Sequence, residues 1–351
     1  MRHLLLLTLG AALVAQEVPF EEVRPSPWLP AWEARISREA TDLVPPKGDF
    51  WRTRGLLRLR WTWGEEGPLR LQVGSAHAAG TDENYENLAW FDNTRSNGSW
   101  LDVAALRVQA LGEAWGLRVE GGLLENPLLL SEAAWDPALR VIGGGLQAFW
   151  RGNGAVEEVA LRAVGGQVRL LEGGRVRLQG AQALLKVGTG PLTWTAFAGP
   201  LRFEARQEDA PAFRRQNPAG PEGYGDPVFR FDAYGLGAAL AGPLPVELRA
   251  QRLSHRPTGQ RGEEFQAWVG SPRKVWWPQA GYVRQRLDAY GALASVNGDQ
   301  WWFHANADGQ RYVLALNLPR QLRLEASVVD QRRRDATQPV RRAILALRKH
   351  F

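Results

Sequence analysis

Arginine is the residue type whose abundance and spacing point most directly to chemistry. The chain of 351 residues has 43 Lys+Arg and a formal net charge of +6, and only Lys47, Lys186, Lys274 and Lys349 are lysines. Many of the arginines recur at every second position, with apolar side chains between them. Because a guanidinium binds carboxylate and phosphate groups through two parallel hydrogen bonds, this pattern indicates fixed recognition of anions.

Catalytic and metal-binding patterns are weak by comparison. Ser75 and His77 are two residues apart and Ser254 and His255 are adjacent, but neither pair has a persuasive third partner. The acidic stretch 82–84 has no regular ligand spacing, and the glycine-rich runs lack the lysine of a phosphate loop. The chain contains no cysteine, which excludes disulfides and thiolate sites. We therefore predict no enzymatic activity, no metal and no cofactor.

The segments that carry the arginines have a period of two. In 56–63, apolar residues from Leu57 to Trp63 alternate with Arg58, Arg60 and Thr62. This alternation predicts β-strands with one apolar face, and no long helix is evident. The mean hydropathy of −0.32 excludes a bundle of membrane helices but not a membrane barrel, whose alternating strands average out.

The connections between these segments alternate in length. Short, turn-rich stretches lie at 64–68, 111–114, 151–154, 188–191, 241–243 and 319–321. Long polar stretches lie between them at 79–99, 125–138, 205–226, 255–282 and 332–339. Short turns on one side and long loops on the other are typical of an outer-membrane barrel with its turns in the periplasm.

The sequence therefore predicts an all-β fold, a transmembrane antiparallel up-and-down β-barrel with short periplasmic turns and long extracellular loops. The number of strands should be even, about sixteen, with fourteen and eighteen left open where the alternation slips at 155–187 and 255–306. The expected strands are 30–38, 52–63, 68–78, 100–110, 115–124, 139–150, 155–171, 175–187, 191–204, 227–240, 244–254, 283–296, 299–306, 310–318, 321–331 and 340–351.

The N-terminal residues have the pattern of a targeting segment. Arg2 precedes the apolar run 4–15, which ends in small residues and is too short to span a bilayer. We predict a signal peptide at 1–15, cleaved near Ala15, a periplasmic linker at 16–29, and a barrel at 30–351. A cleaved secretory signal together with barrel patterning predicts location in the outer membrane of a Gram-negative-type cell envelope.

Two aromatic features support a membrane rather than water around the barrel. Trp63, Trp115, Trp150 and Trp194 all lie beside short turns and share the apolar face of their strands, as in a membrane-interface girdle. Tryptophans in a soluble β core are the alternative. The chain ends in Phe351 after an alternating segment, which is similar to the signal read by the barrel assembly machinery.

Three segments carry a resemblance to a family of porins from Gram-negative outer membranes. They are the arginine-rich 52–61, the stretch 87–109 in which an Asn- and Asp-rich loop leads to Asp102, and 121–147 with its Asn-Pro, Trp-Asp and Gly-Gly-Gly motifs. The resemblance covers 52–150 well and the remainder only as a pattern. It implies a porin barrel, and it carries no catalytic residues.

If the apolar face meets lipid, the opposite face lines the lumen. The pore-lining residues expected on that basis are Arg58, Arg60, Arg70, Arg107, Arg118, Glu120, Arg162, Arg175, Arg177, Glu247, Arg249, Arg311, Arg323, Arg342 and Arg348, with Glu158 and Glu325 as further carboxylates. Guanidinium groups in a water-filled pore attract anions. The alternative is neutralisation by loop carboxylates such as Asp82, Glu83, Glu86 and Asp92.

Together, these expectations predict a porin that lets small hydrophilic solutes diffuse passively and prefers anions. Two alternatives stay open: an outer-membrane hydrolase with a site at the barrel rim, and a closed structural or adhesion barrel. The expected partners are outer-membrane lipid, the barrel assembly machinery and small anionic solutes, and a homo-oligomer is left open. Nucleic acid is not expected, because the basic charge is spread over alternating segments without a recognition motif.

Overall fold

The computed structural model describes residues 28–41, 48–64, 67–80, 98–170, 174–206, 217, 228–272, 274–298, 300–336 and 339–349. The signal peptide at 1–15, nearly all of the linker at 16–29, the acidic stretch 82–92 and Phe351 lie outside these residues. Trp28 and Leu29, which were expected in the linker, already belong to the first strand.

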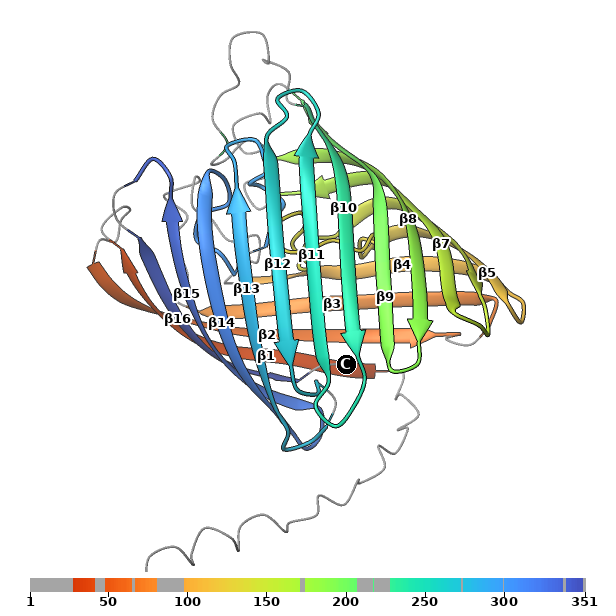
Figure 1. Ribbon diagram of the computed structural model, residues 1–351, viewed down its shortest axis with the longest axis horizontal. Helices are drawn as coiled ribbons and strands as arrows, with labels where there is room; N and C mark the ends of the chain where they lie inside the picture. Colours follow the sequence, from red (N-terminus) through yellow and green to blue (C-terminus); the bar gives the residue numbers. More distant parts are fainter. Residues whose placement is uncertain are drawn as a thin grey trace, which may run out of the picture.

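Sixteen antiparallel strands close into one barrel (Figure 1). Each strand pairs with its neighbours along the chain, and the first pairs with the last. The prediction of an all-β, up-and-down antiparallel barrel of about sixteen strands is confirmed. The strands are β1 (Trp28–Thr41), β2 (Gly48–Trp63), β3 (Leu69–Gly80), β4 (Gly98–Leu111), β5 (Trp115–Leu124), β6 (Val141–Arg151), β7 (Val156–Arg169), β8 (Arg175–Thr189), β9 (Leu192–Ala205), β10 (Val228–Leu240), β11 (Val246–His255), β12 (Arg261–Val269), β13 (Pro278–Leu287), β14 (Ala307–Leu318), β15 (Leu322–Arg333) and β16 (Val340–Lys349).

The two ends of the barrel differ in the length of their connections. At one end the strands are joined by short stretches such as 112–114, 190–191 and 319–321. At the other end lie longer stretches, including 125–140 and 288–306. On the convention that short turns face the periplasm, we call these the periplasmic and the extracellular end.

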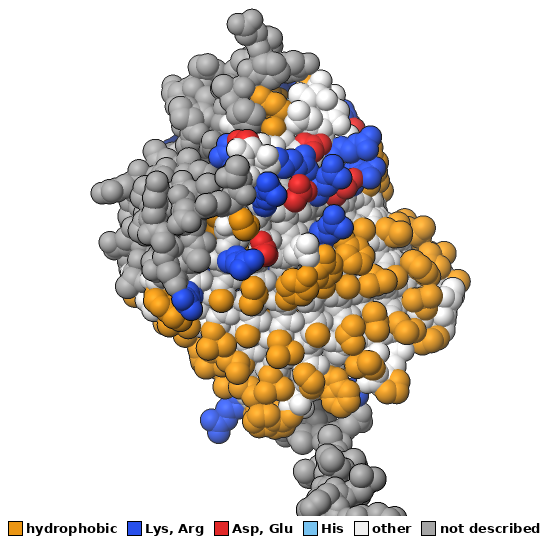
Figure 2. All heavy atoms as spheres, turned by 60° about the vertical axis from the view of Figure 1, so that its left-hand side comes forward, with side chains coloured by type: hydrophobic (Ala, Val, Ile, Leu, Met, Phe, Trp, Pro, Cys, Tyr) orange, Lys and Arg blue, Asp and Glu red, His pale blue; other side chains and the backbone are white. Residues whose placement is uncertain are grey.

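The outer face carries an apolar band below a more charged upper margin (Figure 2). Leu57, Leu161 and Leu314 are among its exposed side chains, at 39%, 62% and 60%. A soluble protein would bury such residues, so the band is a surface for lipid. Among the described residues, no helix is long and apolar enough to cross a membrane.

Two of the expected strands are wrong. The stretch 255–282, expected as one long loop, contains β12, a periplasmic turn and the start of β13. The described residues of 288–306, where strands at 283–296 and 299–306 were expected, instead form turns and bends. The total stays at sixteen because the two misplaced strands replace two real ones.

Candidate functional site

The stretch 125–140, which we name the crossing loop, joins β5 to β6 and runs through the lumen to the opposite wall. The backbone N–H of Leu129 donates to Gln182 Oε1 on β8 at 2.9 Å, and Gln182 Nε2 donates to the Leu129 carbonyl at 3.0 Å. Farther along, the Ser131 N–H donates to Gln251 Oε1 on β11 at 2.5 Å. These bonds fix the crossing loop inside the barrel, where it narrows the lumen.

An ion pair holds the middle of the crossing loop. Arg311 of β14 donates to both carboxylate oxygens of Glu132, at 2.8 and 3.1 Å. The next residue, Ala133, donates its N–H to Glu264 Oε2 on β12 at 2.9 Å. Arg311 is only 8% exposed, so this bidentate pair operates away from bulk water.

A second segment, residues 288–306, folds inward against the crossing loop, and we name it the packing loop. Its Val296 carbonyl accepts the Asp136 N–H at 2.6 Å. On its other side, Gln331 of β15 accepts the Phe303 N–H and donates to the Phe303 carbonyl, both at 2.6 Å. The packing loop is therefore tied to the crossing loop and to the barrel wall.

The two loops share an apolar cluster with the extracellular half of the wall. Its wall members come from strands between β4 and β13 and include the fully buried Phe203 and Phe231. Its loop members include Leu128, Trp135, Leu139, Leu293 and Val296. Burial of this apolar surface stabilises the inward position of both loops. It also fills part of the extracellular half of the lumen.

Asp102 of β4 lies among three arginines, close to the first and last residues of the crossing loop. The buried Asp102 carboxylate lies 3.1 Å from Arg140, 3.7 Å from Arg60 and 3.9 Å from Arg58. Glu125 accepts a hydrogen bond from Arg60 at 2.7 Å. Burial alone would raise the pKa of Glu125, but the two guanidinium groups of Arg60 and Arg140 outweigh burial and hold that pKa below its ordinary value. Glu125 therefore stays ionised.

The wall formed by β2–β7 is rich in arginine. Arg70 lies directly opposite Arg107 in the β3–β4 register, and Arg107 pairs with Glu120 at 3.0 Å. The Arg118 guanidinium lies over the Phe149 ring, 5.1 Å from its centre. The inward cations of this wall are Arg54, Arg58, Arg60, Arg70, Arg107, Arg118, Arg151 and Arg162, and its inward carboxylates are Asp102, Glu120, Glu157 and Glu158.

The facing wall is different in composition. Its inward charged and amide side chains on β11 and β12 are Glu247, Arg249, Gln251, Glu264 and Gln266. The described lumen wall is thus positive along β2–β7, whereas β11 and β12 present two carboxylates and one guanidinium. Such an arrangement sets up a field across the passage.

Open space runs along the lumen on the periplasmic side of the crossing loop. One cavity of about 550 Å³ is lined by this loop together with Arg58 and Arg60. A second of about 690 Å³ extends to Arg323 and Arg348 near the periplasmic end. The two cavities share the lining residues Glu247, Arg249 and Gln266, so they adjoin each other along β11 and β12.

A chain of ion pairs crosses the seam where the barrel closes. Glu33 of β1 accepts hydrogen bonds from Arg54 at 2.8 Å and from Arg348 of β16 at 2.7 Å. Arg348 also contacts Glu325 at 3.3 Å, and Glu325 contacts Arg323 at 3.4 Å. The side chains of this chain are less than one fifth exposed, so they join β1, β2, β15 and β16 inside the barrel.

Most of the residues expected in the pore do face the lumen. They are Arg58, Arg60, Arg70, Arg107, Arg118, Glu120, Arg162, Glu247, Arg249, Arg311, Arg323, Arg342 and Arg348. Many of these arginines pair with carboxylates of the wall and the crossing loop. That pairing resembles the neutralised alternative, although the partners are not the loop residues expected from the sequence.

Arg175 and Arg177 were expected in the lumen, and that expectation is wrong. Both are exposed on the outer face of β8 and alternate with the buried Val176 and Leu178. The usual alternation inverts here because apolar side chains point inward to meet the two loops, while the outer face lies near the extracellular end.

The four expected girdle tryptophans, Trp63, Trp115, Trp150 and Trp194, lie at periplasmic ends of strands, with exposures of 54%, 55%, 45% and 42%. All four are on the outer face. Their position suits a girdle at the membrane interface.

The two candidate catalytic histidines, His77 and His255, do not have the neighbours that a catalytic triad requires. His77 contacts Ser75 at 3.0 Å and Ser99 at 2.8 Å, so its second nitrogen meets a hydroxyl and not the carboxylate that a triad requires. His255 is buried against Phe229 and Tyr290. Across the described residues, no group of three or more His, Asp or Glu side chains could hold a metal ion.

Sequence reasoning missed the residues that position the crossing loop, above all Gln182, Gln251, Glu264 and Glu132. Their signal was present but ambiguous. Gln182 and Gln251 occupy inward positions of otherwise alternating strands, yet any inward polar residue is expected to meet water. Only the path of the loop shows that these amides bind backbone.

Comparison with known proteins agrees with the barrel. No family model matches the chain, and no curated protein matches it significantly. Among solved structures, OprB of Pseudomonas putida superposes with a TM-score of 0.60 at 9% identity, covering 92% of this chain and 94% of that one. OmpF of Salmonella typhi, in a complex with daunomycin, gives 0.54 at 10% identity over 92% and 97%. The fold is that of a porin-like outer-membrane β-barrel.

Proposed function

We propose that this protein is an outer-membrane porin that lets small hydrophilic solutes diffuse passively and prefers anions. The observation that carries the proposal is the arginine-rich wall on β2–β7, which faces a passage narrowed by the crossing loop. A water-filled lumen with more guanidinium than carboxylate groups lowers the energy of an anion and raises that of a cation. The porin-like fold supports the transport class, and the wall supports the selectivity.

Two residues of this wall offer a direct test. Arg70 lies opposite Arg107 on the neighbouring strand, and Arg118 lies on β5, two residues from Glu120, the partner of Arg107. For an ion passing about 8 Å away, each charge contributes about 0.5 kcal/mol in water, and less after screening at 0.1 M salt. Removing both charges with R70Q/R118Q should lower the anion-to-cation permeability ratio about two- to fivefold. The reversal potential in planar bilayers measures this ratio.

A matched control removes the same charge from the outside. R175Q/R177Q changes two exposed arginines on the outer face of β8 and should leave the ratio unchanged. An equal shift in both double variants would contradict the proposed role of the wall. A larger drop of the permeability ratio in R70Q/R118Q at high salt than at low salt would also contradict it, because salt screens the charges and weakens electrostatic selectivity.

A closed structural barrel is the second candidate, and the apolar cluster between the loops favours it. That cluster fills part of the extracellular half of the lumen. The two candidates differ in conductance, because a closed barrel would give no discrete channel steps. The proposed porin should give stable steps that persist when the outer face is altered by R175Q/R177Q.

A hydrolase at the rim has no comparable support. The Ser75–His77–Ser99 contacts supply no acid, and we include the absence of enzymatic activity in the proposal. Hydrolysis of outer-membrane lipids or peptides by the purified protein, abolished by Ser75→Ala, would overturn that part.

A further inference from the structure

A group of arginines lies on the outside of the barrel, where the lumen cannot use it. These exposed residues sit near the extracellular ends of β7–β11, and we name them the outer arginine patch: Arg169, Arg175, Arg177, Arg202, Arg230 and Arg256. The outward carboxylates described on the same stretch of β8–β10 are Glu204, 3.0 Å from Arg202, and Asp232, 2.6 Å from Arg256. Positive charge is therefore in clear excess.

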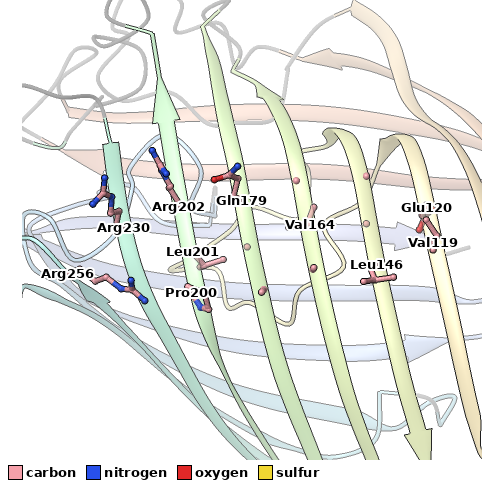
Figure 3. A pocket seen from close by; sticks show the side chains of 16 residues that line it. Val119, Glu120, Leu146, Val164, Gln179, Pro200, Leu201, Arg202, Arg230 and Arg256 are labelled. Carbon is pink, nitrogen blue, oxygen red and sulfur yellow. The ribbon is translucent and has the colours of Figure 1, made fainter.

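Three members of the patch form a row across neighbouring strands (Figure 3). Arg230 lies directly opposite Arg202 in the β9–β10 register. On the other side, Arg256 donates its N–H to the Arg230 carbonyl at 2.8 Å. Like charges directly opposite one another on one face of a sheet are destabilising, so the row is a place for an anion.

On the neighbouring part of the outer face, outward arginines lie beside carboxylates. On β11 and β12, Arg252 pairs with Glu263 at 2.6 Å. On β13 and β14, Arg286 lies 3.9 Å from Asp308. There each of these two arginines lies beside a carboxylate of the next strand, whereas Arg230 of β10 lies opposite another arginine, Arg202 of β9.

The height of the patch matches the boundary of the membrane. Trp194, at the periplasmic end of β9, is eight residues from Arg202 on the same strand. At about 3.3 Å per residue this is about 26 Å along the strand, or about 20 Å along the membrane normal for a tilt near 40°. The apolar band of such barrels is about 25 Å tall, so Arg202 lies near lipid headgroups.

A hollow adjoins the arginine row. The row continues from Arg202 through Gln179 of β8 to Gly165 of β7 and Gly144 of β6. A Cβ added at Gly165 would meet nothing within 4 Å, and one at Gly144 would meet only the Glu120 carbonyl, at 3.5 Å. The packing of the barrel thus does not require glycine at these outward positions. A cavity of about 890 Å³ lies against them, with Arg202, Arg230 and Arg256 at its edge.

We infer that the outer arginine patch and this hollow bind a phosphate-bearing lipid of the outer leaflet. The guanidinium groups of Arg202 and Arg230 hold the phosphate, for which the planar fork of arginine is well suited. An acyl chain lies in the hollow over Gly144 and Gly165. Charge complementarity favours this occupant over a second copy of the chain, whose outward arginines would be repelled.

Binding of lipid A to the full chain in neutral detergent tests the inference. Diphosphorylated lipid A should bind in preference to phosphatidylcholine. A basic residue near an anionic lipid surface contributes about a fivefold gain in affinity, so R202Q/R230Q should weaken binding about thirtyfold. The matched control is R252Q, which changes an outward arginine paired with Glu263 and should have little effect.

A second variant separates the hollow from the charges. Gly165→Leu fills open space outside the barrel, so the barrel should fold normally. This variant should bind lipid A more weakly than the unmodified protein does. Inorganic phosphate should compete with the lipid equally well in both proteins, because the arginines are unchanged. If inorganic phosphate alone binds as well as lipid A, the site is for a free anion and the inference is overturned.

Three further results would also overturn it. They are equal affinity for lipid A and phosphatidylcholine, an equal loss in R252Q and R202Q/R230Q, and a change of oligomeric state in R202Q/R230Q without loss of lipid. The last result would assign this face to contact between copies of the chain. Channel conductance should stay unchanged in all these variants, because the altered residues lie outside the lumen.

Discussion

Replacing Arg311 by methionine should release the crossing loop from the far wall. The change removes the bidentate partner of Glu132 and leaves that carboxylate near Glu264 without a cation. Loss of one partner of a buried ion pair costs about 3–5 kcal/mol. We expect about 3 kcal/mol, the lower end, because Glu132 is 23% exposed and retains some water.

Amide hydrogen exchange measures this loss at the loop itself. The N–H groups of Leu129, Ser131 and Ala133 are protected by wall side chains. If exchange follows docking of the loop, a loss of about 3 kcal/mol accelerates it about 160-fold. Amides in the middle of β14 should keep their protection, because the barrel itself remains closed.

The matched variant is Glu132→Gln. It removes the same ion pair but leaves Arg311 close enough to Glu264 to interact with it electrostatically. Exchange should therefore accelerate much less than in R311M, and E132Q/R311M should be no worse than R311M alone. Unchanged exchange in R311M would refute the anchoring role of the pair, and equal effects of the two single variants would refute the remaining interaction of Arg311 with Glu264.

Three other predictions follow from the same contacts. Gln182→Ala should remove both bonds to Leu129 and accelerate exchange of that amide by at least about fivefold, measured as above. Asp102→Asn should leave its arginine neighbours less neutralised and raise the anion-to-cation permeability ratio in bilayers; a fall in the ratio would contradict the proposed field. Burial alone would raise the pKa of Asp288 in the packing loop, but the hydrogen bond from Arg334 outweighs it and that pKa is lowered. Its contribution to stability is therefore present above an ordinary Asp pKa of about 3.9 and is lost as pH falls through the lower folded value. Proteolysis of the packing loop should increase only in that acidic range, and at higher pH in R334Q.

The barrel could be predicted because lipid imposes a strict rule on its outer face. Strands such as β2 and β14–β16 carry apolar residues at the outward positions of the band, among them Leu57, Tyr312 and Leu345, because these positions meet hydrocarbon. The turns follow from the same reasoning, because a short connection can only join neighbouring antiparallel strands. These two constraints are local, and a single sequence shows them.

The inward loops could not be predicted, because they bring apolar residues into the lumen, where the alternation of the strands leads one to expect polar residues. Trp301, Trp302 and Phe303 resemble a strand segment in sequence, but in the structure they are buried within the lumen. Conversely, Glu263 and Glu264 made β12 resemble a loop, although Glu263 pairs with Arg252 outside and Glu264 binds the crossing loop inside. Both errors come from contacts between residues distant in the chain.

The same cause reversed the two faces of β8 at its extracellular end. Val176 and Leu178 are apolar because they pack on the loops, and Arg175 and Arg177 are polar because they lie beyond the apolar band. A rule that assigns the apolar face to lipid fails wherever the lumen is filled. Arg58 and Arg60 of β2 face inward as expected, because their part of the wall borders open space in the lumen.

The reversal potential of the unmodified protein is the decisive measurement for the proposed anion preference. The full chain is inserted in a planar bilayer with a tenfold gradient of potassium chloride, and the potential at zero current is read from single channels. We predict discrete conducting channels whose reversal potential has the sign of chloride selectivity, with a magnitude that falls as both salt concentrations rise. A potential with the sign of potassium selectivity, or the absence of conductance from correctly folded barrels, would contradict it.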